Sequence, residues 1–396
     1  MIALALATVA CGSMAPKAAK PTPPASASAL PTANPSPTAA PSASSPSTPS
    51  YGILVAFADG TGPQSAGYDL ALVAPDGKVA AKAHAAVRSF IHSPGNGPGG
   101  AAASDLPEVS TSSSRVYYLD GDGDVRSLRP DGSSAHVTQV PGTKTVHAAF
   151  SVTPDDRRIA VSLLDYALSP PAVRLYVEDL QGGGNHAEIF SSQKAWVWPI
   201  GWRQGKLVLA ATSSPPFSQQ GIAWNPYGAP EYHVVDATSA TRLATIGSGQ
   251  DPTGCQPTGP LSAGGSACYH RNATTGGAGY FSTLDWTGRV GSLRVTTDSG
   301  GAPAVTRSGD SLAGCCDPGG TAWIAIPGNR FQSQVRGSFE DWPCFIDEAN
   351  ILFGFLYPTA NQHPQIVNAR RNMDGMVPIQ VPASGYCAGV LPAALD

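Results

Sequence analysis

The sequence predicts an all-β domain that follows an N-terminal targeting segment and a long linker. From Tyr51 onward, short runs rich in Val, Ile, Leu, Tyr and Thr alternate with Gly, Pro and Asp. Almost no stretch keeps a helical period, so strands are the expected elements. The chain also has seven cysteines, which in an exported protein indicate disulfides and an oxidising compartment.

Residues 1–10 form an uncharged run of apolar and small side chains that ends at Cys11. The run has the length of a signal-peptide hydrophobic region and is shorter than the roughly 20 apolar residues that span a bilayer. Val9-Ala10-Cys11-Gly12 resembles the bacterial lipobox, although Thr8 stands where the lipobox has a larger aliphatic residue. The resemblance implies a signal peptide over residues 1–10 and a lipid on Cys11. The alternative is an ordinary secretory signal with an incidental cysteine.

The predicted linker spans residues 11–50. From Gly12 to Ser50 the sequence is almost only Ala, Pro, Ser and Thr, with Lys17 and Lys20 as its charges. This stretch cannot bury enough apolar surface to offset the entropy of ordering, so we expect it to be disordered. Its prolines favour an extended spacer of up to roughly 100 Å, at about 3.1 Å per residue. The predicted β domain then spans residues 51–396.

The cysteine count agrees with a lipid on Cys11, because six cysteines then remain and all six are able to pair. Their connectivity is open, and we expect the neighbours Cys315 and Cys316 to reach two different partners, since bridging neighbours strains disulfide geometry. A zinc cluster is the alternative, but the chain has no Cys-x-x-Cys pair. The six residues are Cys255, Cys268, Cys315, Cys316, Cys344 and Cys387.

Composition excludes one class of partner. Only 13% of the residues are charged and the formal net charge is −4, so the chain offers no basic field for DNA or RNA. We expect no nucleic-acid partner and no cofactor.

Two kinds of repeat organise the domain. Leu119 to Arg129 matches Leu284 to Arg294 at seven of eleven positions, and each copy has an Asp that starts a turn and a Gly that supplies a positive φ. Weaker copies of this hairpin are Val73 to Val79, Val235 to Ser239 and Asp374 to Val377.

The second unit, Phe150 to Val161, is a strand, a Pro-Asp turn and a strand. Trp198-Pro199 before Leu207 and Trp342-Pro343 before Ile351 share one spacing. Runs typical of strands are Ile53 to Phe57, Val116 to Leu119, Ile159 to Leu163, Val173 to Val177, Leu207 to Ala210, Tyr232 to Val235 and Ile351 to Leu356.

The unit from Phe150 to Val161 resembles the blades of WD40-like, TolB-type β-propellers, which carry a Ser-Pro-Asp-Gly turn before an Ile-Ala-Val strand. Here Thr153 and Asp156 stand in place of Ser and Gly. The resemblance implies a β-propeller, and repeat spacings of about 45 to 60 residues give six or seven four-stranded blades, with seven favoured. The N-terminal strand often completes the last blade of such a fold, and Ile53 to Phe57 is the candidate. Two β-sandwich domains are the alternative.

Three alternating carboxylates, Asp120, Asp122 and Asp124, have the pattern of a calcium loop, because a hard cation prefers several oxygen ligands. The bidentate Glu expected at the twelfth loop position is replaced by Asp131, and the matching repeat lacks the acidic triplet. A hairpin turn is the favoured interpretation, with a calcium site as the alternative.

No arrangement of residues predicts a catalytic site. Gly309-Asp310-Ser311-Leu312 spells the signature of GDSL hydrolases, but no Asp-x-x-His pair follows it to supply a base. The eight histidines include no closely spaced pair. The acidic pairs Asp155-Asp156, Glu340-Asp341 and Asp347-Glu348 are interpreted as surface turns.

Trp196, Trp198 and Trp202 form the densest aromatic group. Alternation on a strand places Trp196 and Trp198 on one face, which is typical of packing between blades. The alternative is an exposed platform for a sugar or peptide ligand.

Together these features predict a lipid-anchored, extracytoplasmic propeller at the cell surface or in the periplasm, without enzymatic activity. We expect it to bind a protein or a cell-envelope polymer through loops such as Gly95 to Leu106, Ser213 to Pro230 and Gly247 to Gly265. The alternative is a hydrolase or lyase that acts on envelope polysaccharide through carboxylates in the propeller channel.

Overall fold

The computed structural model describes residues 49–58, 65–88, 107–216, 226–247, 254–271, 279–296, 303–317, 321–336, 341–355, 363–369, 378–393 and 395. The predicted signal segment over residues 1–10, Cys11 and most of the linker lie outside these residues, as does the hairpin copy from Asp374 to Val377. The first strand, β1, begins at Tyr51. Within the described ranges, no helix is long and apolar enough to cross a membrane.

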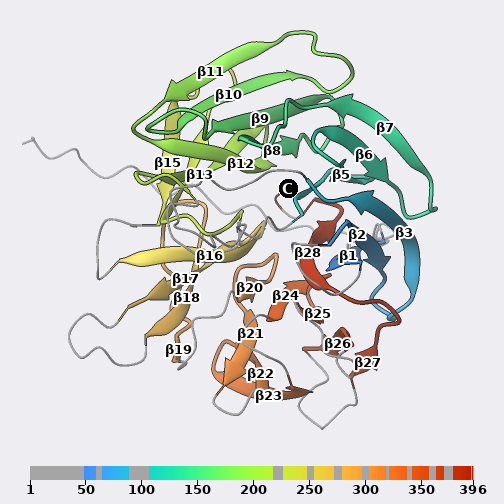
Figure 1. Cartoon of the computed structure of the whole chain (residues 1–396). Helices are drawn as coiled ribbons and strands as arrows, with labels where there is room; N and C mark the ends of the chain where they lie inside the picture. The colour runs from blue at the N-terminus through green and yellow to red at the C-terminus, as the bar shows by residue number, and fades with distance from the viewer. Residues whose placement is uncertain are drawn as a thin grey trace, which may run out of the picture. The chain divides into compact units, whose positions relative to one another are not determined.

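Seven four-stranded antiparallel sheets form a ring around a central axis, so the seven-bladed propeller predicted from the sequence is confirmed (Figure 1). Blade 1 consists of β4 (Val109–Thr111), β5 (Val116–Asp120), β6 (Asp124–Leu128) and β7 (Ser134–Gln139). Blade 2 consists of β8 (Val146–Val152), β9 (Arg158–Asp165), β10 (Ala172–Asp179) and β11 (Ala187–Ser192). Blade 3 consists of β12 (Trp196–Arg203), β13 (Lys206–Thr212), β14 (Glu231–Val235) and β15 (Arg242–Ile246).

Blades 4 to 6 follow in chain order. Blade 4 consists of β16 (Cys255–Ser262), β17 (Gly265–His270), β18 (Tyr280–Leu284) and β19 (Val295–Thr296). Blade 5 consists of β20 (Ala304–Val305), β21 (Leu312–Asp317), β22 (Thr321–Ile326) and β23 (Asn329–Arg336). Blade 6 consists of β24 (Asp341–Phe345), β25 (Asn350–Phe355), β26 (Gln365–Asn368) and β27 (Ile379–Gln380).

Blade 7 joins the two ends of the domain. Its inner strand is the last in the sequence, β28 (Tyr386–Leu391), and its outer strands are the first three, β1 (Tyr51–Phe57), β2 (Gly67–Val73) and β3 (Val79–Ala86). β1 pairs antiparallel with β28, from Tyr51 opposite Leu391 to Val55 opposite Tyr386 (Figure 1). The predicted strand Ile53 to Phe57 therefore does take part in closure, but three N-terminal strands contribute to the last blade instead of one.

Each blade buries both of its faces against its neighbours. The apolar clusters join adjacent blades: Ile53 and Leu70 of blade 7 pack with Val116 of blade 1, and Phe281 of blade 4 packs with Trp323 of blade 5. Strands such as β1 and β8 are consequently buried at nearly every position instead of at every second one. This explains why the predicted strands are continuous apolar runs, and all seven of them form.

The inner strand of each blade is a sheet edge that faces the channel. Edge strands tolerate proline, because one side of the strand needs no backbone donor. Pro199 lies in β12, Pro257 in β16 and Pro343 in β24. The prediction of a loop from Gly247 to Gly265 is wrong for this reason, since residues 255–262 form the inner strand of blade 4 despite their prolines.

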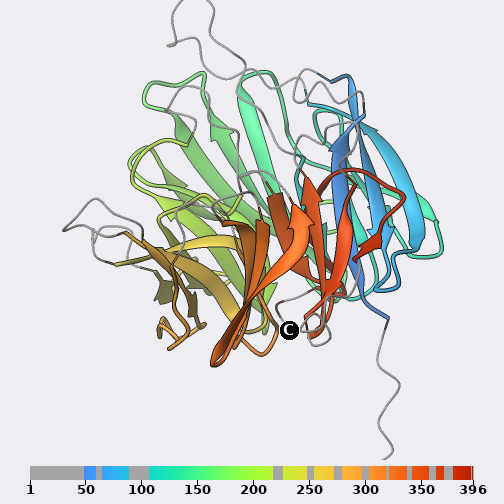
Figure 2. The ribbon, with the colours of Figure 1, turned by 90° about the horizontal axis from the view of Figure 1, so that it is seen from below.

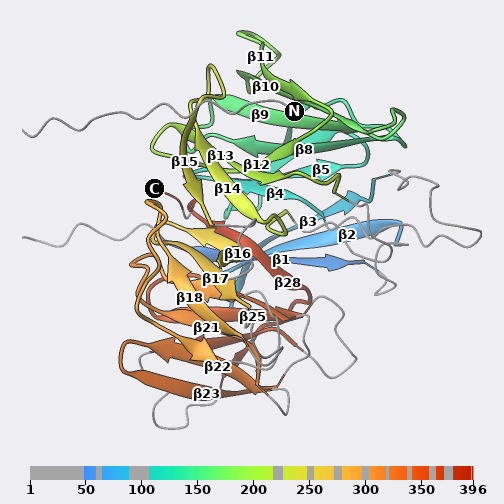
Figure 3. The same ribbon diagram turned by 90° about the vertical axis from the view of Figure 1, so that its left-hand side faces the viewer.

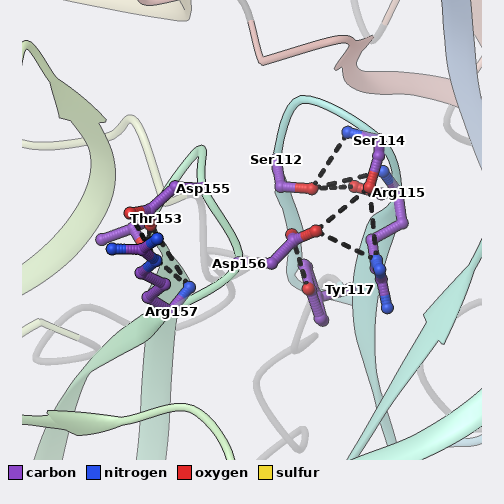
Figure 4. Close-up of polar contacts among 8 residues, drawn as sticks. All are labelled: Ser112, Ser114, Arg115, Tyr117, Thr153, Asp155, Asp156 and Arg157. Carbon is purple, nitrogen blue, oxygen red and sulfur yellow. Dashed lines mark hydrogen bonds and ion pairs between the residues drawn. The ribbon is translucent and has the colours of Figure 1, made fainter.

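Repeated turns connect the first and second strands of the blades. Thr153 to Arg158 and Thr306 to Ser311 close with the same backbone bonds, and Gly309 has φ 78° where Asp156 has φ 62°. Asp156 thus occupies a left-handed position that favours glycine. Its carboxylate contacts blade 1, accepting hydrogen bonds from Tyr117 Oη at 2.7 Å and Ser114 Oγ at 3.1 Å (Figure 4).

The long sequence match between Leu119 to Arg129 and Leu284 to Arg294 does not relate equivalent places in two blades. Asp120 to Asp124 joins the second and third strands of blade 1, whereas Asp285 to Arg289 follows the third strand of blade 4. The shared residues therefore reflect the common chemistry of a tight turn and not the blade period.

Two disulfides have both of their cysteines described, and the two bridges join different parts of the ring. Cys255–Cys268 links neighbouring strands of blade 4, while Cys344–Cys387 links the inner strands β24 and β28 of blades 6 and 7. Cys315 is also disulfide-bonded. Because the two bridges use the other four C-terminal cysteines, the expectation that Cys315 and Cys316 reach different partners among them is wrong.

The Cys344–Cys387 bridge ties the closing strand β28 to blade 6, so its removal should loosen ring closure. The variant C344A/C387A is expected to lose about 4 kcal/mol of unfolding free energy, from the loop-entropy cost of a 43-residue separation. Hydrogen exchange should rise in β28 and β1. The control C255A/C268A should lose about 3 kcal/mol without faster exchange in β28; faster exchange there in both variants would contradict the assignment.

Asp156 is expected to trade backbone strain for contacts with blade 1. Asp156→Ala keeps the strained φ and loses the hydrogen bonds to Tyr117 and Ser114, so it should lower the unfolding free energy by about 2 kcal/mol. Asp156→Gly loses the same bonds but relieves the strain, so its loss should be smaller. Denaturant titration measures both, and an alanine variant that is more stable than the glycine variant would refute this balance.

Candidate functional site

The two faces of the ring differ in the connections that they carry. Inner strands begin at one face, named here the connection face, and end at the other, named the turn face. The two longest intervals between strands, residues 87–108 and 213–230, both start and finish at the connection face. The predicted binding loop from Gly95 to Leu106 and residues 217–225 of the loop from Ser213 to Pro230 lie outside the described residues. The turn face carries short turns such as Ala74 to Lys78, which close with backbone bonds.

The chain enters the domain at the turn face. Tyr51, the first residue of β1, lies opposite Leu391 at the end of β28, and both therefore lie where the inner strands finish. Figures 2 and 3 show the ring from its sides. The connection face is thus directed away from the point where the linker joins.

A narrow channel runs along the ring axis, lined by the inner strands. Its cavity is about 90 Å³, far below the several hundred Å³ of a typical ligand pocket. Most of its lining is apolar, with Phe150, Ile200 and Phe345 among the lining side chains. Among the described residues of this lining, Glu108 is the only acid and Arg307 the only base.

The C-terminal residues close the channel at the turn face. Ala393 N donates to Ser112 O at 2.8 Å, and Arg307 Nη2 donates to Ala393 O at 3.3 Å. Leu395 is 7% exposed and packs against Gly201, where a Cβ atom would lie 2.3 Å from its Cδ1. Glycine at position 201 therefore makes room for the Leu395 side chain.

A buried ion pair lies at the other end of the channel. Arg88 Nη2 is 3.2 Å from Glu108 Oε2, and both side chains are less than a tenth exposed. Arg88 Nη1 also donates to Ala148 O of blade 2 at 2.6 Å. Burial, followed by the charge of Glu108, raises the pKa of Tyr227 to about 12, so Tyr227 stays protonated beside this pair.

These residues were not identified from the sequence. Arg88, Glu108 and Tyr227 come from three separate segments, and each stands alone there without a motif. Only the closure of the ring brings these three residues together, so no local sequence pattern predicts that they form a cluster.

The alternative of an exposed aromatic platform is wrong, because all three tryptophans are buried. Trp196, Trp198 and Trp202 are at most 4% exposed, and each indole N–H donates to a backbone carbonyl. Trp202 bonds Ser151 O of blade 2, which is the packing between blades that the sequence favoured.

Two of the three candidate calcium ligands contact protein donors. Arg126 Nη1 is 3.4 Å from Asp120 and 3.7 Å from Asp124, and His136 also bonds Asp124. Asp120 additionally accepts a hydrogen bond from Ala86 N at 2.8 Å. These contacts lie in a hairpin turn and agree with the interpretation that the sequence favoured.

The other sequence candidates lie in turns. Ser311 is buried at the end of the turn between the first and second strands of blade 5, where its hydroxyl donates to Asp310. Glu348 of blade 6 accepts hydrogen bonds from Ser308 N and Oγ of blade 5, both at 3.0 Å. This contact joins neighbouring blades in the same way as the contact of Asp156 with blade 1. Asp155 bonds within its own turn, and the side chains of Glu340 and Asp341 lie outside the described set.

One cluster has the composition of a metal site. Ligand atoms of Cys255, Cys268 and His270 lie within 4.8 Å of one another. The disulfide between the two cysteines removes the thiolates that a metal would need, so only the imidazole is left as a donor.

Comparisons with known proteins find similarity among solved structures. No family model and no curated protein matches the chain. It is similar to TolB from Acinetobacter baumannii, with 15% identity and a TM-score of 0.40 over 73% of this chain and 65% of that one, so it spans just under two thirds of that protein.

Two further solved structures are similar to larger shares of the chain. The Dos1 propeller has 13% identity and a TM-score of 0.44, with 85% and 86% of the two chains covered. AztD from Citrobacter koseri has 10% identity and a TM-score of 0.46, with 87% and 98% covered. At such identities the likeness concerns architecture and not activity.

The Arg88–Glu108 pair makes a prediction about stability. Glu108→Gln should leave a buried guanidinium without its carboxylate and lower the unfolding free energy by about 3 kcal/mol. The double variant R88M/E108L removes both charges and should recover most of this loss. Denaturant titration of the single and double variants tests the coupling; purely additive losses would show that the two groups do not depend on each other.

Proposed function

We propose that this protein is a lipid-anchored, extracytoplasmic propeller that binds a protein or a cell-envelope polymer, without catalysing a reaction. The observation that carries the proposal is the polarity of the ring. The linker joins at the turn face through Tyr51, and the two longest connections, 87–108 and 213–230, belong to the opposite face. A tether at one face and long connections at the other suit a module that presents a binding surface away from the membrane.

Two features support the anchor and the compartment. Structural disulfides are typical of oxidising compartments, and Cys255–Cys268 and Cys344–Cys387 are both buried. The Pro-rich segment after Cys11 gives the reach that a surface module needs to extend from a membrane.

The channel supports binding over polysaccharide cleavage. A polymer-degrading site needs two carboxylates separated by several Å around the scissile bond, and room for a sugar ring. Within the described lining, the single acid Glu108 is paired with Arg88, and the cavity of about 90 Å³ has no room for a sugar unit beside it. The described channel lining contains no histidine, and the histidine–acid pairs among the described residues, such as His84 with Asp69 at 2.8 Å, lie outside it.

The anchor is tested by fractionation. Cys11→Ala in the full-length chain should shift the protein from the membrane fraction to the soluble fraction, because no acyl chain would then be attached. A conservative control, Ser13→Ala, should stay with the membrane. Unchanged fractionation of Cys11→Ala would contradict the lipid anchor.

The binding face is tested by photo-crosslinking in cells. A photoreactive residue replaces Leu168, which is 46% exposed at the connection between β9 and β10 on the connection face. The control replaces Asp131 in an exposed turn on the turn face. Adducts should form from position 168 and not from 131, and the reverse pattern would contradict the proposed orientation. Release of reducing ends from purified envelope polysaccharide by the protein would favour the enzyme.

A further inference from the structure

A groove lies on the flank of the ring between blades 4 and 5, separate from the channel and from the connection face. Its volume is about 1010 Å³, which is at the upper end of the range for ligand sites. The turns Asp285 to Arg289 and Ser308 to Asp310 border it on the turn face.

The groove exists because the outer strand of blade 4 is short. β19 pairs with β18 at only two positions, Tyr280 opposite Thr296 and Phe281 opposite Val295. Between the turn and β19 the chain runs irregularly from Val290 to Arg294, held by Gly291 N donating to Thr283 O at 2.8 Å. A full outer strand would fill this space, as in blade 5, where β23 is eight residues long.

The groove combines apolar surface with arginines on both sides. Val290 is 42% exposed within it. Arg294 of blade 4 lies over the ring of Tyr280 with its Cζ 5.1 Å from the centroid, and Arg330 of blade 5 lies over Trp323 at 5.6 Å. Stacking on a ring holds each guanidinium plane in place at the border of the groove.

The third arginine, Arg289, stands on the turn beside them and is 3.2 Å from Asp285. The acids of the groove are engaged within their own turns. Asp285 accepts from Thr287 and from Arg289, and Asp310 accepts from the hydroxyls of Thr306, Ser308 and Ser311. These carboxylates are thus held by local donors while the guanidiniums of Arg294 and Arg330 border the groove.

Glycine backbone completes the lining. Gly264, Gly291, Gly309 and Gly328 all border the groove. A Cβ atom at Gly264 would lie 2.3 Å from Gly309 N, so glycine lets these two turns pack closely at the groove's edge.

We propose that this groove binds a segment of an anionic cell-envelope polymer, with successive phosphate or carboxylate groups bound by the arginines of blades 4 and 5. Guanidinium groups suit both anions, because their paired N–H donors match two oxygens at once. Apolar residues of the lining, such as Val290 and Leu293, suit the uncharged part of each repeat unit. The inference rests on the proposed function for the extracytoplasmic location, but this surface is distinct from the connection face and binds whether or not that face has a partner.

The test uses the purified full-length chain and three immobilised polymers: poly(glycerol phosphate), polygalacturonate and neutral dextran. At least one anionic polymer should bind, with an affinity that falls as salt is raised, while dextran should not. Arg294→Gln with Arg330→Gln should weaken binding by about a hundredfold, since each of the two lost charged hydrogen bonds costs roughly tenfold. The polymer that binds more tightly distinguishes phosphate from carboxylate.

The matched control, Arg174→Gln with Arg242→Gln, removes two exposed positive charges from β10 and β15 of other blades, and should leave binding within about twofold of the original. Arg294→Lys with Arg330→Lys keeps the charge but loses the planar fork, and should fall between the two. Thermal unfolding of each variant shows that it is folded. Equal binding of dextran, an equal loss in the control, or binding to phosphatidylglycerol vesicles but to neither polymer would overturn the proposal.

Discussion

The backbone pairing of β1 with β28 is the interaction on which the rest of the structure depends. A ring of separate sheets has no covalent closure of its own, so the first and last strands must share a sheet. Here three N-terminal strands and one C-terminal strand form that sheet, and Cys344–Cys387 adds a covalent link from its inner strand to blade 6. The same pairing places Tyr51 beside Leu391, and this single register fixes the face at which the linker joins.

Closure also determines where polar groups are tolerated. Because both faces of each blade are buried, charged side chains inside the ring must be paired, as Arg88 is with Glu108. At the turns, carboxylates serve instead to join one blade to the next. Asp156 has a left-handed backbone conformation, and its contacts with Tyr117 and Ser114 offset the strain of that conformation. Gly309, at the equivalent position of another turn, has no side chain that could join two blades.

The architecture was readable from the sequence because it depends on local patterns, whereas the site depends on distant residues. Continuous apolar runs gave the strands, and the Pro-Asp turn from Thr153 to Arg158 gave the resemblance that implied a propeller. The inner strand at residues 255–262 was missed because its prolines are typical of loops, and only its position at a channel edge makes them acceptable. The ion pair at Arg88 joins segments that carry no motif, so composition and spacing held no trace of it.

Variation in the outer strands gives this fold surface that closure does not constrain. Inner strands must reach their neighbours around the axis, but an outer strand is free to shorten, as β19 and β27 do with two residues each. Beside the short β19, Arg294 stacks on Tyr280 of blade 4 and Arg330 stacks on Trp323 of blade 5. Binding chemistry is therefore able to change on the flank and at the connection face while the core between blades, and with it the ring, stays the same.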